Sequence, residues 1–99
     1  MPETISLKTI VVAAKDQVSC SLGDEAAILH MQTGIYYGLD PVGARIWNLM
    51  QEPRTVEELR TAIVAEYEVE PARCEGDLFM LLGKLQTEGL IEVRNGSAS

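Results

Sequence analysis

The chain has 99 residues, a net charge of −7 and 46% hydrophobic residues. A chain of this length forms one domain with a single core, too small to enclose a large active site. The hydrophobic fraction is that of a folded protein, while the negative charge repels nucleic acid and anionic membrane surfaces.

The first 32 residues predict two strands after an N-terminal arm. Residues 1–8 are expected to form a loose arm, and Thr9–Ala14 a short extended segment that covers the sheet. Apolar and polar residues alternate in Val18–Leu22, which is typical of a half-buried strand, and Gly23-Asp24 supplies a tight turn. The next strand, Glu25–Gln32, has apolar residues on both faces, so we expect it to be central: Ala27, Leu29 and Met31 share one face, and Ala26, Ile28 and His30 the other.

A third strand and a helix start follow directly. The turn Gln32–Gly34 leads into Ile35–Leu39, which is rich in residues that favour strands, and the three strands form an antiparallel meander. Asp40-Pro41 then combines a good N-cap with a proline at the first helical position. Because successive strand residues alternate, Tyr36 and Tyr37 point to opposite faces, and the sequence leaves open which of them is buried.

Two helices are predicted in the middle of the chain. The first runs over about Pro41–Gln51, with apolar residues at helical spacing, and Pro53 breaks it. Thr55–Glu58 forms a capping box, in which a threonine hydroxyl and a glutamate three residues later satisfy each other's backbone amides. This capping box opens a second helix that ends near Tyr67.

A third helix begins at Pro71 and ends near Gly89, where the chain continues into a short extended end, Leu90–Val93. Strands followed by three helices predict a small α+β domain of winged-helix type, with one three-stranded antiparallel sheet. The buried stripe of the third helix is expected to comprise Cys74, Leu78, Leu81, Leu82 and Leu85.

The residues that could carry catalysis are sparse. The sequence has no glycine-rich phosphate loop, no cluster with metal-ligand spacing and no nucleophile motif. Cys20 and Cys74, with His30 as the one histidine, are too few for a structural zinc site, and neither cysteine has a base positioned by its neighbours. We therefore expect free, buried cysteines and a protein that is not an enzyme and needs neither cofactor nor metal.

Winged-helix architecture raises DNA binding as an alternative. A helix that reads DNA shows Lys, Arg, Asn or Gln along its exposed face. Here the third helix offers Arg73 and Lys84, and the second offers Arg60, and both helices carry more acidic than basic side chains. This balance is unfavourable for phosphate contact, so no nucleic-acid partner is expected. The opposing acidic residues are Glu57, Glu58, Glu66, Glu70, Glu75, Asp77 and Glu88.

The run Gly34–Trp47, GIYYGLDPVGARIW, resembles the TGxYYxLNxxGxxIW core of the PqqD-like proteins. Pro53–Leu59 and the apolar spacing of the third helix also fit this family, and the resemblance covers about residues 17–93 of one domain, 1–99. Asp40 stands where the family often has asparagine, and either residue caps a helix. PqqD-like proteins are recognition elements for the leader peptides of ribosomally synthesised, post-translationally modified peptides.

The resemblance implies a non-catalytic adaptor that binds the leader region of a precursor peptide. In lasso-peptide pathways, such discrete proteins hand the precursor to a separate leader peptidase and cyclase. A chaperone for a radical-SAM peptide-modifying enzyme is the other setting that the resemblance implies. Outside this class, a small protein-binding scaffold or regulatory domain is the main alternative. The absence of a signal-peptide pattern or a long apolar run favours a cytoplasmic protein without a membrane partner.

The family places its peptide groove between the third strand and the third helix. A free strand edge exposes unpaired N–H and C=O groups that template another strand, either a leader segment or a second copy in a homodimer. Leu78 and Leu81 are expected to form the apolar floor, with Arg73, Asp77 and Lys84 at the rim. The implied peptide-binding residues are Ile35, Tyr36, Tyr37, Gly38, Leu39, Arg73, Asp77, Leu78, Met80, Leu81 and Lys84.

Overall fold

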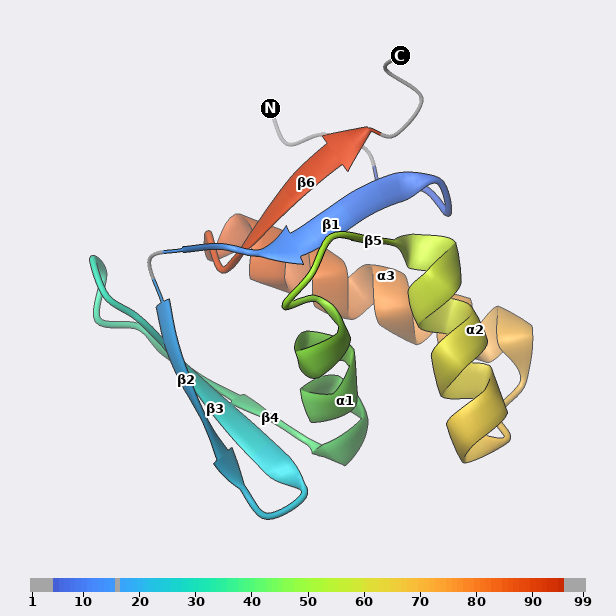
Figure 1. The fold of residues 1–99 in the computed structure, drawn as a ribbon, viewed down its shortest axis with the longest axis horizontal. Helices are drawn as coiled ribbons and strands as arrows, with labels where there is room; N and C mark the ends of the chain where they lie inside the picture. Colours follow the sequence, from blue (N-terminus) through green and yellow to red (C-terminus); the bar gives the residue numbers. More distant parts are fainter. Residues whose placement is uncertain (1–4, 16, 96–99) are drawn as a thin grey trace.

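The computed structural model describes residues 5–15 and 17–95 (Figure 1). Three helices pack against two small antiparallel sheets, so the α+β class is confirmed. None of the helices in this part of the chain is long and apolar enough to cross a membrane. The elements are β1 (Thr9–Ala13), β2 (Gln17–Leu22), β3 (Glu25–His30), β4 (Tyr36–Leu39), α1 (Pro41–Leu49), β5 (Arg54–Thr55), α2 (Val56–Tyr67), α3 (Pro71–Thr87) and β6 (Ile91–Asn95).

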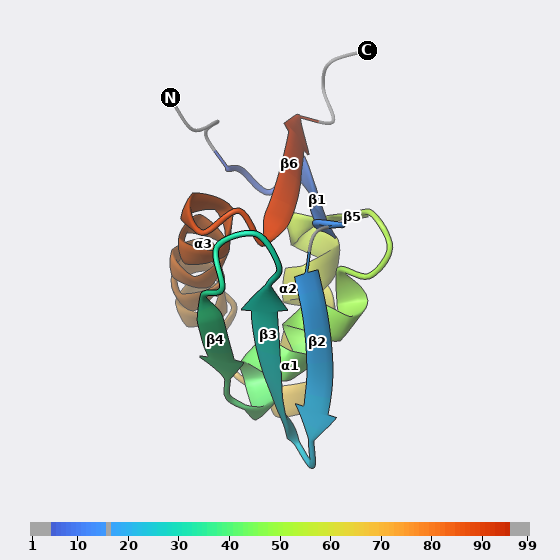
Figure 2. The same ribbon diagram turned by 90° about the vertical axis from the view of Figure 1, so that its left-hand side faces the viewer.

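The predicted meander is the sheet β2-β3-β4, with β3 in the centre (Figure 2). Its register places Ile28 of β3 between Ser19 of β2 and Tyr37 of β4. The second strand ends at His30, two residues earlier than predicted. A turn explains this end, because the His30 N–H donates to the Ile35 carbonyl and the Gly34 N–H donates back to the His30 carbonyl, both at 2.9 Å.

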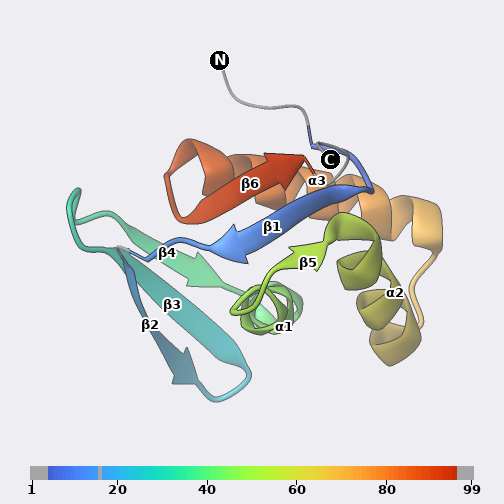
Figure 3. The same cartoon turned by 45° about the horizontal axis from the view of Figure 1, so that its top comes forward.

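A second sheet, β5-β1-β6, was not predicted. Thr9–Ala14 was expected to cover the first sheet, and this expectation is wrong. β1 is instead the central strand of the second sheet, paired along its length with β6 from Thr9–Asn95 to Ala13–Ile91. The two segments lie far apart in the chain but side by side in space (Figures 1 and 3). Each strand thereby satisfies main-chain groups that a lone extended segment would leave unpaired.

The starts of α1 and α2 agree with the capping residues predicted from the sequence. Asp40 caps α1, with its Oδ1 accepting from the Gly43 N–H at 2.7 Å. At α2 the capping box is complete, since the Glu58 N–H donates to Thr55 Oγ1 at 3.2 Å and the Thr55 N–H donates to Glu58 Oε1 at 2.8 Å. α1 ends at Leu49, slightly earlier than predicted, and the next carbonyl, that of Met50, accepts from the β1 N–H of Ala13 at 2.8 Å.

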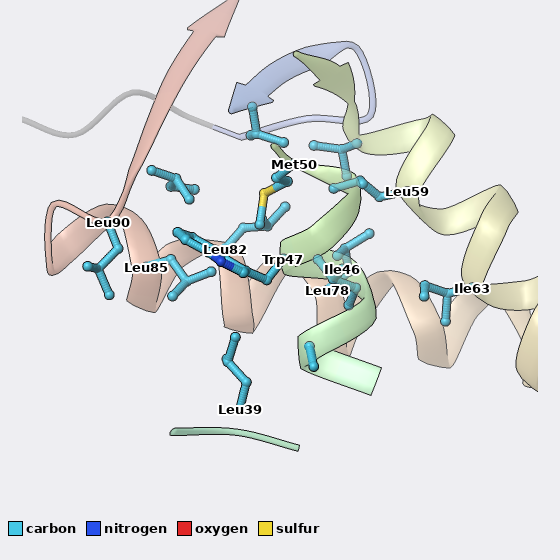
Figure 4. Close-up of a cluster of buried hydrophobic side chains, with 14 of the residues drawn as sticks. Leu39, Ile46, Trp47, Met50, Leu59, Ile63, Leu78, Leu82, Leu85 and Leu90 are labelled. Carbon is cyan, nitrogen blue, oxygen red and sulfur yellow. The ribbon is translucent and has the colours of Figure 1, made fainter. Parts of the chain in front are cut away.

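The core lies where the three helices meet the sheets (Figure 4). Trp47 of α1 is 1% exposed and is one of the largest fully buried side chains. The stripe predicted on α3 is buried at four of its five positions, while Leu81 is partly buried. Leu39 points from β4 toward this core, which ties the sheet to the helices (Figure 4). Around Trp47 and Leu39 the labelled core residues are Ile46, Met50, Leu59, Ile63, Leu78, Leu82, Leu85 and Leu90.

The capping box gives a prediction about stability. Thr55→Ala should lower the free energy of unfolding by about 1 kcal/mol, because it removes the oxygen that satisfies a first-turn amide. Urea unfolding at neutral pH measures this loss. A variant as stable as the wild type would show that the capping hydrogen bonds make no net contribution.

The same box predicts a pH dependence. The hydrogen bond from the Thr55 backbone N–H lowers the pKa of the Glu58 carboxyl. A carboxyl whose pKa is lower in the folded state stabilises the fold above its ordinary pKa, and this stabilisation is lost as the pH falls through the folded-state value. The stability difference between wild type and Glu58→Gln should therefore shrink between neutral pH and about pH 3. A difference that does not change over this range would contradict the assignment.

Candidate functional site

The expected open strand edge lies at β4. β4 pairs with β3 on one side, and no strand in residues 5–15 and 17–95 pairs with its other side. The hydrogen bond from the His30 N–H to the Ile35 carbonyl shows which residues face β3, because bonded and non-bonded pairs alternate along an antiparallel ladder. This alternation turns the main-chain groups of Tyr37 and Leu39 toward β3. Those of Tyr36 and Gly38 face the open edge.

The two tyrosines have different surroundings. Tyr37 shares a face with buried Leu39, is half-buried and packs against the core. Tyr36 lies on the opposite face and is 66% exposed. Tyr37 is therefore the tyrosine on the helix side of the sheet, which answers the question that the sequence left open.

Two cavities flank β4 on the side of α3. The first, of about 370 Å³, is lined by Gly38 and Leu39 of β4 and by Asp77 and Leu78 of α3, among others. The second, of about 620 Å³, is lined by Tyr37 and by the C-terminal half of α3, around Met80 and Lys84. Tyr37 lines both cavities. The end of β4 lines the first cavity with the N-terminal half of α3, and the beginning of β4 lines the second with the C-terminal half. β4 and α3 therefore run in opposite directions.

Most of the sequence-predicted site residues line these cavities. Leu78 is 1% exposed, so it forms a buried floor, and Leu81 lies partly exposed beside it. Met80, at 63% exposure, lines the second cavity and not the first. Ile35 and Tyr36 line neither cavity. The first cavity contains Tyr37, Gly38, Leu39, Arg73, Asp77, Leu78 and Leu81, and the second contains Tyr37, Met80 and Lys84.

The sequence prediction missed the contribution of the first two helices to the first cavity. Tyr67 at the end of α2 and Val69 just beyond it line this cavity and are 39% and 37% exposed. Two large apolar side chains near a predicted helix end are a signal that could have been used. The other missed residues are Asp40, Val42, Gly43, Ile46, Ile63 and Cys74 in the first cavity, and Phe79, Gly83, Thr87 and Glu88 in the second.

The charged side chains near the groove differ in whether they are paired. Arg45 and Glu66 form a two-pronged ion pair at 3.0 and 3.1 Å, and Arg60 donates to Glu75 at 3.1 Å. The bond to Glu66 raises the pKa of Arg45 above its ordinary value. In contrast, the ion pairs within the described part of the chain do not include the exposed Arg73, Asp77 and Lys84. These last three side chains are therefore available to a ligand.

The two cysteines and the histidine lie in different surroundings. Burial raises the pKa of the Cys74 thiol, and this side chain lines the first cavity. Cys20 is exposed, against expectation. His30 Nδ1 accepts the N–H groups of Gln32 and Thr33 at 3.2 and 3.4 Å, which holds the turn before β4. In residues 5–15 and 17–95, no group of three or more His, Cys, Asp or Glu side chains could hold a metal ion.

Comparisons with known proteins agree with this geometry. Residues 25–91 match the family described as coenzyme PQQ synthesis protein D (PqqD). The fold is similar to the solved structure of TbiB1 in complex with the TbiA(β) leader peptide, with a TM-score of 0.77 and 43% sequence identity over 82% of this chain and 94% of that one. No curated protein matches the chain. The matched region contains the whole β3-β4 edge and all of α3, and the chain therefore belongs to the PqqD family.

Proposed function

We propose that this protein binds the leader region of a ribosomally made precursor peptide by adding the leader as a fourth strand beside β4. The observation that carries the proposal is an open strand edge that faces two cavities lined by α3. Its relative TbiB1, 43% identical, is itself in complex with a leader peptide. An extended peptide at such an edge gains affinity from main-chain hydrogen bonds and specificity from pockets for alternate side chains.

The geometry defines how the leader would bind. Tyr36 and Gly38 would exchange main-chain hydrogen bonds with the added strand, because the β3-β4 register turns their main-chain groups toward the open edge. Leader side chains on the helix side would recur about every 6.7 Å and could enter the two cavities that Tyr37 lines. The buried floor at Leu78 favours apolar leader side chains there. Binding must also offset the cost of ordering a peptide that is disordered when free.

The proposed role is that of a non-catalytic adaptor. Cys74, whose thiol has a raised pKa, suits a wall of the groove rather than a nucleophile, and the imidazole of His30 is engaged by a turn. The bound precursor would be presented to separate enzymes, in the cytoplasm where ribosomal peptides are made. A leader peptidase and a cyclase of a lasso-peptide pathway are the partners that we propose. A radical-SAM peptide-modifying enzyme is the alternative partner, and a scaffold that binds a folded protein is the rival function.

The first test is an NMR titration of labelled protein with a synthetic leader from the short reading frame beside the gene. Saturable chemical-shift changes should cluster in Tyr36–Leu39 and Arg73–Lys84, because these segments form the two walls. The lack of any shift up to about 1 mM peptide, which corresponds to about −4 kcal/mol, would exclude recognition of that leader.

Strand addition predicts a strong effect of proline at the open edge. Gly38→Pro should weaken leader binding about tenfold, because it removes an N–H that faces the leader and sets a ring in its path. Calorimetry with the same synthetic leader measures the affinity. The matched control is Gly38→Ala, which keeps the N–H and adds a methyl group with no atom within 4 Å.

Equal affinities of the proline and alanine variants would show that the leader does not pair with this edge. The unfolding midpoint of both variants should stay near that of the wild type, because the Gly38 N–H does not bond to β3 by the register of the sheet.

The rim charges predict a salt-dependent effect. Asp77→Lys should change leader affinity up to about fivefold at low salt, the range of exposed ion pairs, and the change should shrink in high salt. Titrations at low and high ionic strength check this. Glu25→Lys makes the same charge change at an exposed position outside both cavities and serves as the control. If both substitutions have the same effect, or Asp77→Lys has none at low salt, Asp77 is not part of the site.

The last part of the proposal is a homodimer that forms through an exposed strand edge. The groove beside β4 suits a single added strand, because α3 lines both cavities there. A second copy that offered its own β4 would also bring its own α3 into the same space. Self-pairing is therefore better served by an edge without a neighbouring helix.

A further inference from the structure

The β2-β3-β4 sheet has a second open edge, at β2. Figure 2 shows β2 on the outside of the sheet, opposite β4, and no helix or strand in residues 5–15 and 17–95 lies beyond it. The views in Figures 1 and 3 agree. β4 faces α3 across the two cavities, whereas β2 faces solvent. The two edges of one sheet therefore have different surroundings.

The main-chain groups of β2 that face solvent follow from the register. His30 and Ile28 bond toward β4, so Leu29 and Ala27 bond toward β2, where they pair with Val18 and Cys20. The intervening residues of β2 direct their N–H and C=O groups to the free edge. These residues are Gln17, Ser19 and Ser21.

β2 has none of the features by which proteins protect a strand edge. Its sequence, QVSCSL, contains no charge, proline or glycine, although the chain carries 15 acidic residues. Pairing with β3 is continuous from Gln17–His30 to Leu22–Glu25, so no bulge bends the edge away. Val18 is 53% exposed, and Cys20 is also exposed. An uncharged, regular edge of this kind is a template for another strand.

We infer that β2 is a self-association edge, at which two copies of the chain pair their β2 strands antiparallel about a two-fold axis near Ser19. The result is one continuous six-stranded sheet in the order β4-β3-β2-β2-β3-β4. This inference specifies the edge for the homodimer proposed above, and it does not depend on leader recognition, since it uses the opposite edge of the sheet.

A second copy fits this edge better than an unrelated strand does. Antiparallel pairing about a two-fold axis is self-complementary, because the same surface serves both subunits. With Ser19 opposite itself, Gln17 of each copy lies opposite Ser21 of the other, and all three present outward main-chain groups. No two charged residues of β2 are brought together, since the strand has none. Both β4 edges stay free at the far ends of the joined sheet.

Net charge sets how the association should respond to salt. Each copy carries −7, so two copies repel one another at long range while the edge itself is uncharged. Added salt screens this repulsion. The dimer should therefore become tighter as ionic strength rises, which is the opposite of an association held by ion pairs.

Sedimentation of a matched pair of variants tests the inference. Wild type and Ser19→Ala should change from monomer to dimer as the concentration rises from about 10 μM to about 1 mM, the range of weak association. Ser19→Pro should remain a monomer, because it removes an N–H that faces the free edge and makes no bond to β3. All three should bind a synthetic leader equally, so failure of the dimer and failure of leader recognition are separate results.

A spin label distinguishes the two edges. Cys20 is exposed and Cys74 is buried, so a nitroxide reagent reacts at Cys20. Pairing through β2 places the labelled strands about 5 Å apart, whereas pairing through β4 would separate them by five strand spacings, about 24 Å. Strong dipolar broadening that disappears on dilution is expected. Labels that are far apart, a monomer at about 1 mM, or a dimer that survives Ser19→Pro would each overturn the inference.

Charged variants keep the test decisive if the proline variant does not fold. Ser19→Asp and Ser19→Lys each place like charges at the two-fold axis, so each alone should be monomeric. An equimolar mixture of the two should form a heterodimer, because the charges at the axis are then opposite. Folded variants that do not associate when mixed would overturn the inference.

Discussion

The register between β3 and β4 is the constraint on which the candidate site depends. A slip by one residue would exchange the two faces of β4, because strand side chains alternate. With Ile28 opposite Tyr37, Leu39 enters the core and the main-chain groups of Gly38 remain at the open edge. The turn held by His30 fixes one end of β4, and the Asp40 cap of α1 follows the other end directly. Four residues of strand are thus positioned from both ends.

α3 has two roles because its sides differ. Leu82 and Leu85 are fully buried in the core, while Leu78 reaches the floor of the first cavity. Its polar side chains also divide into two groups. Glu75 pairs with Arg60 of α2, whereas Arg73, Asp77 and Lys84 line the groove and lack an ion pair within the described part of the chain. The helix therefore stabilises the fold on one side and offers charges and apolar surface to a ligand on the other.

The two open edges of the sheet differ in what stands beside them. At β4 a helix lies next to the edge, which leaves room for one strand and supplies pockets for its side chains. At β2 no helix or strand of residues 5–15 and 17–95 lies beyond the edge, so a whole subunit could approach. The same main-chain chemistry thus underlies both proposals, recognition of a peptide at one edge and association of two copies at the other. Neighbouring elements, and not the strands themselves, produce this difference.

Local signals in the sequence were sufficient for much of the fold and for part of the site. The strand at β2, the Asp40-Pro41 start of α1 and the capping box of α2 all depend on residues within a few positions of one another, and each is confirmed. The half-burial that the alternation predicted for β2 is wrong, since Val18 and Cys20 are exposed. The motif around Tyr37 was sufficient to indicate the family, which the comparisons show. It also directed attention to β4 and α3, whose residues line the two cavities.

Tertiary structure decided what depends on segments far apart in the chain. The pairing of β1 with β6 joins the two ends of the chain, and no local pattern in either segment specifies its partner. Tyr67 and Val69 reach the first cavity because α2 packs against α3. Alternation alone made Tyr36 and Tyr37 equivalent until the helices covered one face of the sheet. Propensity and capping act between near neighbours, whereas the choice of partner and of buried face depends on how the whole chain packs.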